Sequence, residues 1–417
     1  MADGGKPWWR CPGVLVATTA AVCAALWWQA THGPWNSHLV VDPVVYWQRA
    51  TFFLGQGTWA GMGVNEYQPG ALWFFAGLGA LAGGPGDFDP FLRVLMAANV
   101  FLLVLHVGLA QWRGPRGAGW VMLFFAALTG PLLLYRFELL VSLLVLSAWL
   151  LWERRWLVPA AVLLGVATAT KIYPVLLVPW LLMSAWRTGR WREFSGVAAG
   201  FAAGGAIVLA PLGLAGARWS DVTGALDFHF DKPFGIEGLL GSGIPLVQGW
   251  LGLPLRMAPR NGIYGFESDL GAAATFLLEW CWLPAVAVVV WMVWRRDQGR
   301  NWPPAAAMFV LFGWYVVLGK LMAPQYLWWT VPFLAFVPFG WFRHGEWCAV
   351  AGLTAATLVL GQVVYPVNYS EFLQCFNGDY LGNRFYWLNL VKNVLWFSAV
   401  TLATVALVRQ RERTGGE

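Results

Sequence analysis

The sequence has little charge. Only 12% of its 417 residues are Asp, Glu, Lys or Arg, while 59% are hydrophobic. Soluble domains carry about 25% charged residues, so this composition excludes an ordinary soluble protein. The mean hydropathy of +0.57 and the 30 Trp and 24 Pro residues agree with this, because Trp gathers at membrane interfaces and Pro is tolerated in membrane helices. The composition predicts a protein embedded in a bilayer.

Cysteine and histidine are also sparse. The five cysteines and five histidines show no Cys-x-x-Cys pair and no spacing typical of a metal site, so neither a disulfide framework nor a zinc site is indicated. His229 and Asp231 could form a metal pair, but two ligands without a third are weak evidence. We therefore expect no metal ion and no cofactor. The net charge of +6 indicates basic cytoplasmic loops rather than nucleic-acid binding.

A cleavage site is missing as well. The first apolar stretch, residues 11–28, follows Lys6 and Arg10, and no small-residue cleavage site precedes a soluble domain. We interpret it as a retained helix and not as a signal peptide. Because no soluble tail of any size is recognisable, we expect a single polytopic membrane domain over residues 1–417.

Short basic loops divide the apolar runs into pairs and mark the cytoplasmic side of a membrane protein. They contain Arg113 and Arg116; Arg154 and Arg155; Arg187, Arg190 and Arg192; Arg295, Arg296 and Arg300; Arg343; and Arg409, Arg411 and Arg413. The paired runs are 120–134 with 139–152, 157–170 with 172–186, 195–215 with 270–294, 303–319 with 324–342, and 346–366 with 388–408. Each pair is predicted to form a hairpin with its tip outside.

Residues 31–112 must then contain an odd number of crossings, although they offer two apolar runs. The run at 91–112 has 22 residues and the Gly-rich run at 70–83 has 14, and only the longer one can span a hydrocarbon core of about 30 Å. We assign 91–112 as the crossing and 70–83 as a juxtamembrane or re-entrant helix on the outer face. The fold prediction is an all-α integral membrane protein with about twelve transmembrane helices and both termini cytoplasmic. Its extracytoplasmic loops span 31–90, 216–269 and 367–387.

Several helices beside the hairpin tips are short for a full span. Short helices at membrane depth persist only where protein or a watery cavity satisfies their polar groups, so we expect a cavity open to the outside, with further re-entrant helices as the alternative. Three tips carry a cation that orientation does not require: Arg136 in LLYRFELL, Lys171 in ATATKIYPVLLVPW and Lys320 in LGKLMAPQYLWWTVP. Intramembrane cations are costly and usually functional, which makes these residues candidate anion ligands. Snorkelling of the same side chains to the outer interface is the competing interpretation.

Asp42 stands out among the few acids of the first outer loop, in the segment VVDPVVYWQRA. If a helix begins at Pro43, Asp42 is its N-cap and Pro43 takes the first helical position. The functional alternative is a general base, which needs an ionised carboxylate close to an acceptor hydroxyl. Capping does not forbid this second role.

Five segments carry a resemblance when they are taken in order. They are DPVVYWQRATFFLGQG with EYQPGALW, the YRFE tip, ATKIYPVLLVPWLL, FHFDKPFGIEGL and KLMAPQYLWWTVP. Over residues 38 to 335 the chain resembles the actinobacterial polyprenyl-phosphate-sugar-dependent glycosyltransferases of the GT-C superfamily. Within it the resemblance is to glycosyltransferase family 87, the group with the alpha-mannosyltransferases of phosphatidylinositol mannoside synthesis and an arabinofuranosyltransferase.

The resemblance implies a catalytic aspartate at the start of a first outer loop that has juxtamembrane helices, and Asp42 matches that position. Gln68 replaces a Pro of the usual family pattern, and APQYLWW stands where some mannosyltransferase members have a Ser-Trp and paired-His motif. These departures leave the sugar and the acceptor open. We expect two further groups of site residues. The donor phosphate or the substrate is expected to be bound by Arg136, Lys171, Tyr173, His229, Lys232, Lys320, Gln325 and Tyr326. The acceptor or the loop is expected to be positioned by Tyr46, Glu66, Tyr67, Arg93, Glu138 and Glu237.

The sequence is therefore interpreted as an inverting glycosyltransferase of a bacterial plasma membrane that uses a polyprenyl-monophosphate sugar, with mannose as the first choice. Its partners would be that donor, a glycolipid or glycan acceptor and membrane lipids, but no nucleic acid. A nucleotide-sugar enzyme would be expected to have a Gly-rich phosphate-binding loop on a soluble fold, and this chain has no such domain. The alternatives are an arabinofuranosyltransferase of the same fold, or a transporter or flippase of lipid-linked sugars. Loops 31–90 and 216–269 do not echo each other, as the repeats of many transporters would.

Overall fold

The computed structural model describes residues 12–62, 66–187, 189–230, 232, 235–253, 256–260, 263–267, 304–339, 344–374 and 381–409, with the single residues 273, 287 and 291. Within these residues, five helical stretches are long and apolar enough to cross a membrane. They are α1 (Pro12–His32), α5 (Phe88–Arg113), α11 (Trp191–Leu214), α17 (His344–Gln362) with its continuation η4 (Val363–Val367), and α19 (Arg384–Arg409). At 1.5 Å per residue, the 26 residues of α5 extend about 39 Å. An all-α membrane protein is thus confirmed, while the predicted count of twelve crossings stays a prediction.

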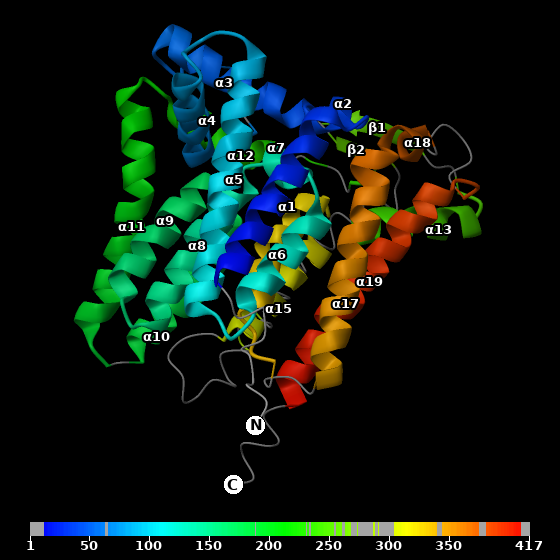
Figure 1. The fold of residues 1–417 in the computed structure, drawn as a ribbon. Coiled ribbons are helices and arrows are strands. Elements are labelled where there is room, and N and C mark those ends of the chain that lie inside the picture. The colour runs from blue at the N-terminus through cyan, green and yellow to red at the C-terminus, as the bar shows by residue number, and fades with distance from the viewer. Residues whose placement is uncertain are drawn as a thin grey trace.

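Shorter apolar helices lie among these long ones (Figure 1). They are α4 (Pro69–Leu81), α6 (Ala118–Thr129), α7 (Leu132–Tyr135), α8 (Glu138–Glu153), α9 (Leu157–Thr170), η2 (Tyr173–Leu177) with α10 (Val178–Trp186), and α15 (Ala305–Leu318). The pair α9 and α11 packs with the backbones in close approach, since a Cβ on Gly165 would lie 2.2 Å from the carbonyl oxygen of Phe201. Small residues at helix contacts permit this close packing in membranes.

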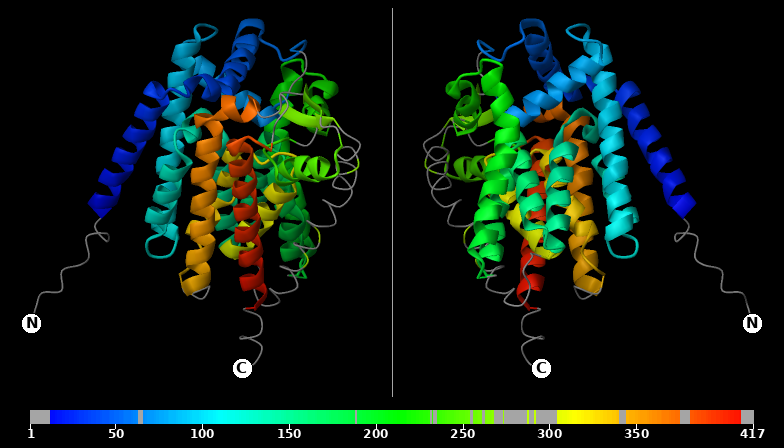
Figure 2. Two further views of the ribbon diagram at one scale, coloured as in Figure 1. Left: turned by 90° about the vertical axis from the view of Figure 1, so that its right-hand side faces the viewer. Right: turned by 90° about the vertical axis from the view of Figure 1, so that its left-hand side faces the viewer.

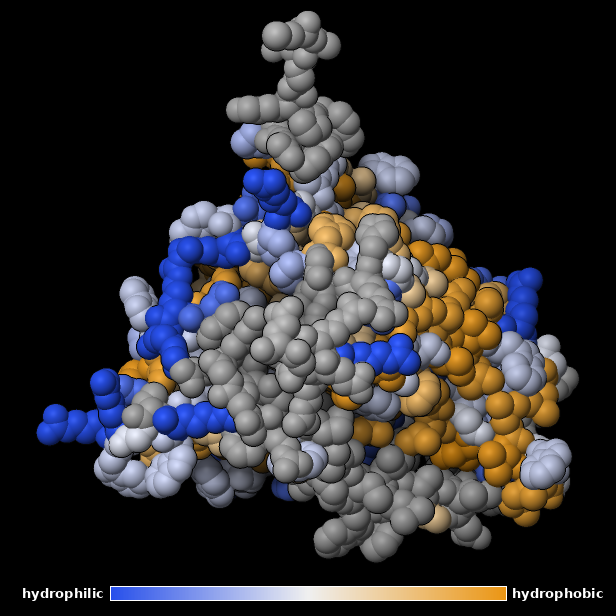
Figure 3. Space-filling view, turned by 90° about the horizontal axis from the view of Figure 1, so that it is seen from below, coloured by the Kyte–Doolittle hydropathy of each residue, from blue (hydrophilic) through white to orange (hydrophobic). Residues whose placement is uncertain are grey.

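The two ends of the bundle differ (Figures 1 and 2). One end, which we call the basic end, holds the turns after α5, α8 and α10 and the last residue of α19. Its arginines are Arg113, Arg116, Arg154, Arg155, Arg187, Arg190, Arg192 and Arg409. Figure 3 shows hydrophilic side chains at this end beside an apolar flank. The other end, which we call the loop end, holds α2 (Asn36–Leu39), α3 (Val41–Gln56) and α18 (Tyr369–Gln374).

Exposed tryptophans lie toward both ends of the bundle. Those of the basic end include Trp112, Trp156, Trp186 and Trp191, and those toward the loop end include Trp28, Trp219, Trp250 and Trp387. Tryptophan is enriched at the two membrane–water interfaces because its ring is apolar and its N–H is polar. The two sets therefore agree with a multi-pass membrane protein whose helices run between two interfaces.

The described residues of the segment predicted as the first outer loop, 31–90, form a packed layer at the loop end. Helices α3 and α4 pack closely, so that a Cβ on Gly79 would lie 3.0 Å from the Cβ of Ala50. Two hydrogen bonds tie the layer to α11: Trp73 Nε1 donates to the carbonyl of Val208 over 3.0 Å, and Thr58 Oγ1 donates to the carbonyl of Ala215 over 2.5 Å. This layer positions Asp42 above the bundle.

Two sequence predictions are wrong in detail. Asp42 does not cap a helix that begins at Pro43, because α3 begins at Val41 and Asp42 lies in its first turn without a side-chain cap bond. The continuous crossing predicted at 324–342 is instead the 3-10 turn η3 (Pro324–Trp329) followed by the five-residue helix α16 (Val331–Ala335). Pro324 and Pro332 lack the N–H that a continuing helix needs. The crossing predicted at 270–294 lies outside the described residues, apart from the single residues 273, 287 and 291.

The segment predicted as the second outer loop also contains helices and a strand pair. Residues 216–269 include α12 (Trp219–Phe230), α13 (Leu239–Trp250) and an antiparallel hairpin of β1 (Arg256–Arg260) and β2 (Ile263–Glu267). A hydrogen bond holds the turn between α12 and α13 to the residues that precede η3: Gly235 N–H donates to the carbonyl of Lys320 over 2.7 Å. The same turn is fastened to the hairpin by Ile236 N–H, which donates to the carbonyl of Tyr264 over 3.1 Å.

Candidate active site

Asp42 forms an ion pair with Arg136 at the loop end. Arg136 Nη1 lies 2.5 Å from Asp42 Oδ2, and the two side chains are 4% and 35% exposed. The backbone of Arg136 is extended, so the helical path is interrupted at this residue, between the end of α7 and the start of α8. Arg136 Nη2 also donates to the hydroxyl of Tyr365 over 2.7 Å, and that hydroxyl donates to the carbonyl of His38 over 3.0 Å. A buried guanidinium thus fixes a carboxylate that solvent can still reach.

A second ion pair joins Glu138, at the same tip as Arg136, to Lys171, at the tip between α9 and η2. Lys171 Nζ is 2.6 Å from Glu138 Oε1, with side chains 15% and 3% exposed. The ammonium also lies 4.8 to 5.0 Å from the ring centroids of Phe137, Tyr326 and Trp329. Cation–π attraction is strongest where water is excluded. These contacts hold the Lys171 side chain inside the protein, so it has not snorkelled into solvent.

A third group gathers around Glu66, just before α4. Burial first, and then the charge of Asp42, raise the pKa of Glu66, while Lys232 and a hydrogen bond from Tyr67 lower it. Burial also lowers the pKa of His229 to about 3, helped by the charges of Lys232 and Lys171. His229 is thus neutral at physiological pH, with Nε2 3.1 Å from the carbonyl oxygen of Glu66. The charge of Asp42 thus acts on Glu66, and Lys232 acts on both Glu66 and His229.

Tyr46 packs against aromatic residues next to this group. Its ring is 1% exposed and stacks on Phe75 with centroids 4.2 Å apart, while it meets Tyr67 and Phe137 edge-on. Tyr46 of α3, Phe75 of α4 and Phe137, which directly precedes α8, thereby form one aromatic cluster. Tyr46 acts as packing that fixes the loop.

Glu237, in the turn before α13, shares charge interactions with Arg136 and Asp42. Burial raises its pKa, and the charge of Lys392, a hydrogen bond from Tyr369 and the charge of Arg136 lower it. Lys392 is 2% exposed, and its Nζ lies 3.4 Å from the carbonyl oxygens of both Glu237 and Met322. Helix α19 thus reaches into the loop end and holds the turn that carries Glu237.

Several buried polar atoms around these pairs have no hydrogen-bond partner in the part of the chain that the structure describes. They are Arg136 Nε, Glu138 Oε2, the Tyr173 hydroxyl and Gln325 Oε1. Buried polar groups are nearly always satisfied in native proteins, and each exception calls for an explanation. A polar substrate would provide partners for such atoms.

Two predicted residues do not join this cluster through the contacts above. Arg93 is exposed on the first turns of α5. Lys320 takes part through its backbone carbonyl, which binds Gly235, and the predicted contact of its ammonium with a phosphate stays a prediction.

Three residues that contact the site, Tyr365, Tyr369 and Trp329, were not among those predicted from the sequence. A signal for Tyr365 was present, because VYPV at 364–367 repeats the pattern of IYPV at 172–175. In both places Tyr-Pro follows an apolar run at a tip of the loop end. Trp329 had no such signal among so many tryptophans.

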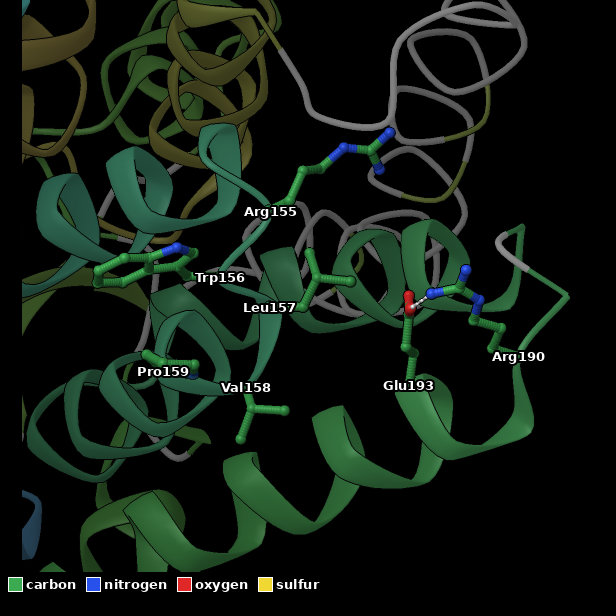
Figure 4. Close-up of a pocket in the computed structure, with 7 residues that line it drawn as sticks. All are labelled: Arg155, Trp156, Leu157, Val158, Pro159, Arg190 and Glu193. Atoms are coloured by element: carbon green, nitrogen blue, oxygen red, sulfur yellow. Dashed lines mark hydrogen bonds and ion pairs between the residues drawn. The ribbon is translucent and has the colours of Figure 1, made fainter.

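A pocket of about 800 Å³ lies elsewhere, at the basic end. Figure 4 shows it between the start of α9 and the start of α11, with Arg190 and Glu193 paired at 3.1 Å. The other lining residues are Arg155, Trp156, Leu157, Val158 and Pro159. It contains none of the predicted site residues, so we place the candidate active site at the loop end on the grounds of chemistry.

A helical membrane protein with a reachable carboxylate, held by a guanidinium and surrounded by cations and aromatic rings, has the features expected of an integral-membrane glycosyltransferase. Residues 66–324 match the model of glycosyltransferase family 87. Since the match covers more than half of the chain, the chain belongs to this family and is a glycosyltransferase. Comparison with curated proteins finds no match.

Proposed function

We propose that the protein is an inverting glycosyltransferase that moves mannose from a polyprenyl-monophosphate donor to a glycolipid or glycan acceptor. The observation that carries the proposal is the Asp42–Arg136 pair, in which the carboxylate stays 35% exposed among the cations of the loop end. The choice of mannose and of a polyprenyl phosphate rests on the resemblance of the sequence segments.

Asp42 is proposed as the general base. Its carboxylate takes the proton from an acceptor hydroxyl, and the oxygen attacks the anomeric carbon from the face opposite the phosphate. The bond between that carbon and the phosphate oxygen breaks, and its electron pair leaves with the polyprenyl phosphate. Arg136 holds the Asp42 carboxylate in place through their ion pair, because opposite charges in contact attract strongly where one of them is buried.

The leaving phosphate needs positive charge. Lys171 and Lys232 lie in the same electrostatic environment as Glu66 and Asp42, and Arg136 Nε is a buried donor with no partner among the described residues. Fixed cations stabilise the charge that develops on a leaving group. We propose that these side chains do so without a metal ion or cofactor. Tyr173, Gln325 and Tyr326 then contribute polar contacts to the substrate.

The orientation follows from charge. Arginine-rich short loops stay in the cytoplasm, and they gather at the basic end. We propose that the basic end and both termini face the cytoplasm of a plasma membrane, so that the loop end with Asp42 faces outside. A lipid donor and a hydrophilic acceptor can meet there.

The test is release of polyprenyl phosphate by the purified protein from a panel of polyprenyl-phosphate sugars, with products identified by mass. We expect release with mannose and formation of a mannosylated product. Release from the arabinofuranose donor alone would assign the other sugar. No release from any donor would refute the proposal and leave the transporter alternative.

A further inference from the structure

Two different sets of side chains flank the Asp42–Arg136 pair. The first set comprises the cations Lys171 and Lys232 with His229, which share charge interactions with one another and, through Lys232, with Asp42. In the second set Tyr365 accepts a hydrogen bond from Arg136 at 2.7 Å and meets Tyr369 edge-on with ring centroids 4.8 Å apart. The two sets, which we call the first and the second side, therefore suit different chemical groups.

The second side is a continuous polar and aromatic surface. The Tyr369 hydroxyl donates a hydrogen bond to the carboxylate of Glu237. The His38 ring lies 5.7 Å from the Tyr369 ring, and its Nε2 is 2.9 Å from the hydroxyl oxygen of Ser370. Ser370 is exposed and Tyr369 is partly buried, so a molecule from outside can reach this surface beside Asp42.

Helix α19 builds this surface from behind. Asn389 Nδ2 donates to the carbonyl of Ile236 over 3.0 Å, and Asn393 Nδ2 donates to the hydroxyl of Ser242 over 2.5 Å. Lys392 holds the carbonyl of Glu237 between these two bonds. A row of buried polar side chains in a membrane helix is costly, and here it fixes the backbone of the turn that carries Glu237.

We propose that Glu237, Tyr369, His38 and Ser370 form the acceptor half of the site, and that this half takes an uncharged sugar ring whose hydroxyl reaches Asp42. Carboxylate, imidazole and hydroxyl groups can donate to or accept from several hydroxyls at once, and the tyrosine rings offer an apolar face. Glu237 would repel an anionic acceptor. The inference rests on the proposed function, and nothing in the family match assigns it, because His38, Tyr369 and Ser370 lie outside residues 66–324.

The experiment uses the purified full chain with polyprenyl-phosphate mannose as donor, octyl mannoside as the neutral acceptor probe and its 6-phosphate as the anionic probe. Tyr369→Phe keeps the ring and removes the hydroxyl, and Glu237→Gln keeps the shape and removes the charge. The matched control is Tyr135→Phe, which removes a buried hydroxyl that donates to the carbonyl of Ala30 over 2.5 Å and has no contact with this surface among those described above. Transfer and acceptor-free hydrolysis of the donor are measured for each variant.

We expect Tyr369→Phe to raise the KM for octyl mannoside by about tenfold, the scale of one hydrogen bond, while donor hydrolysis and the control stay at the wild-type value. Glu237→Gln should narrow the preference for octyl mannoside over its 6-phosphate. An unchanged KM in both variants, an equal loss of hydrolysis and transfer, or equal use of both probes by wild type would overturn the inference. Absence of donor cleavage in wild type would instead refute the proposed function.

Discussion

Removal of the Asp42 charge is the sharpest perturbation of the proposed mechanism. Asp42→Asn keeps the shape of the side chain and removes the base, and general-base catalysis is worth about 10²–10⁴-fold. We expect turnover to fall by that factor while donor binding persists. The structure adds a stability effect, because Arg136 is 4% exposed and loses its anionic partner. Breaking a fully buried pair costs about 3–5 kcal/mol. Since Asp42 is 35% exposed and the Asn oxygen still accepts a hydrogen bond, we expect about 1–2 kcal/mol here.

The chain supplies a matched control. Asp89 is the second residue of α5 and precedes Pro90, just as Asp42 is the second residue of α3 and precedes Pro43. Asp89 is exposed, so Asp89→Asn makes the same change at an equivalent helix position and should leave turnover unchanged. The assay is product formation from the lipid donor, with melting temperature and donor binding measured in parallel. If Asp42→Asn keeps more than about a tenth of the activity, or if Glu66→Gln loses more than it does, the base has been misassigned.

Three further outcomes are expected. Lys171→Met alone should unfold readily, because the buried Glu138 carboxylate loses its cation at a cost of about 3–5 kcal/mol. The double variant Lys171→Met with Glu138→Gln should fold and lose about ten- to a hundredfold in kcat/KM for the donor. Wild-type kinetics in the double variant would exclude a contact between Lys171 and the phosphate. In a background with all five cysteines replaced by serine, Leu81→Cys should react with an impermeant reagent added to intact cells and Arg116→Cys should not. The reverse labelling would invert the topology. The pKa of Glu66 in the folded protein is raised above its ordinary 4.5, so the folded state holds the Glu66 proton more tightly than the unfolded state. The melting temperature should therefore fall as pH rises from 4.5 through the raised pKa, and it should fall less in Glu66→Gln. Equal slopes of melting temperature against pH in the two proteins would show that Glu66 is not desolvated.

Hydrophobic runs and arginine positions predicted most of the long helices of this protein. The run at 91–112 became α5, and 388–408 became α19, because an apolar segment of this length in lipid must satisfy its backbone internally as a helix. The sequence also made Asp42, Arg136, Glu138 and Lys171 candidates, since charges are rare in such a chain. Asp42 stood in the predicted first outer loop and the other three at predicted hairpin tips.

The partners of those charges could not be predicted. The sequence presents two equivalent Asp-Pro helix starts, at Asp42 and Asp89, and local rules treat them alike. Only the tertiary structure brings Arg136 to one of them, across 94 residues of chain, and leaves the other exposed. Tyr365 and Lys392 likewise join the site from helices near the C-terminus, more than 200 residues from Arg136 in sequence. The sequence by itself determined the membrane helices, because burial of apolar surface and backbone hydrogen bonding are local requirements. The pairing of charges was decided by the packing of distant helices, because an ion pair depends on distance in space and not on distance along the chain.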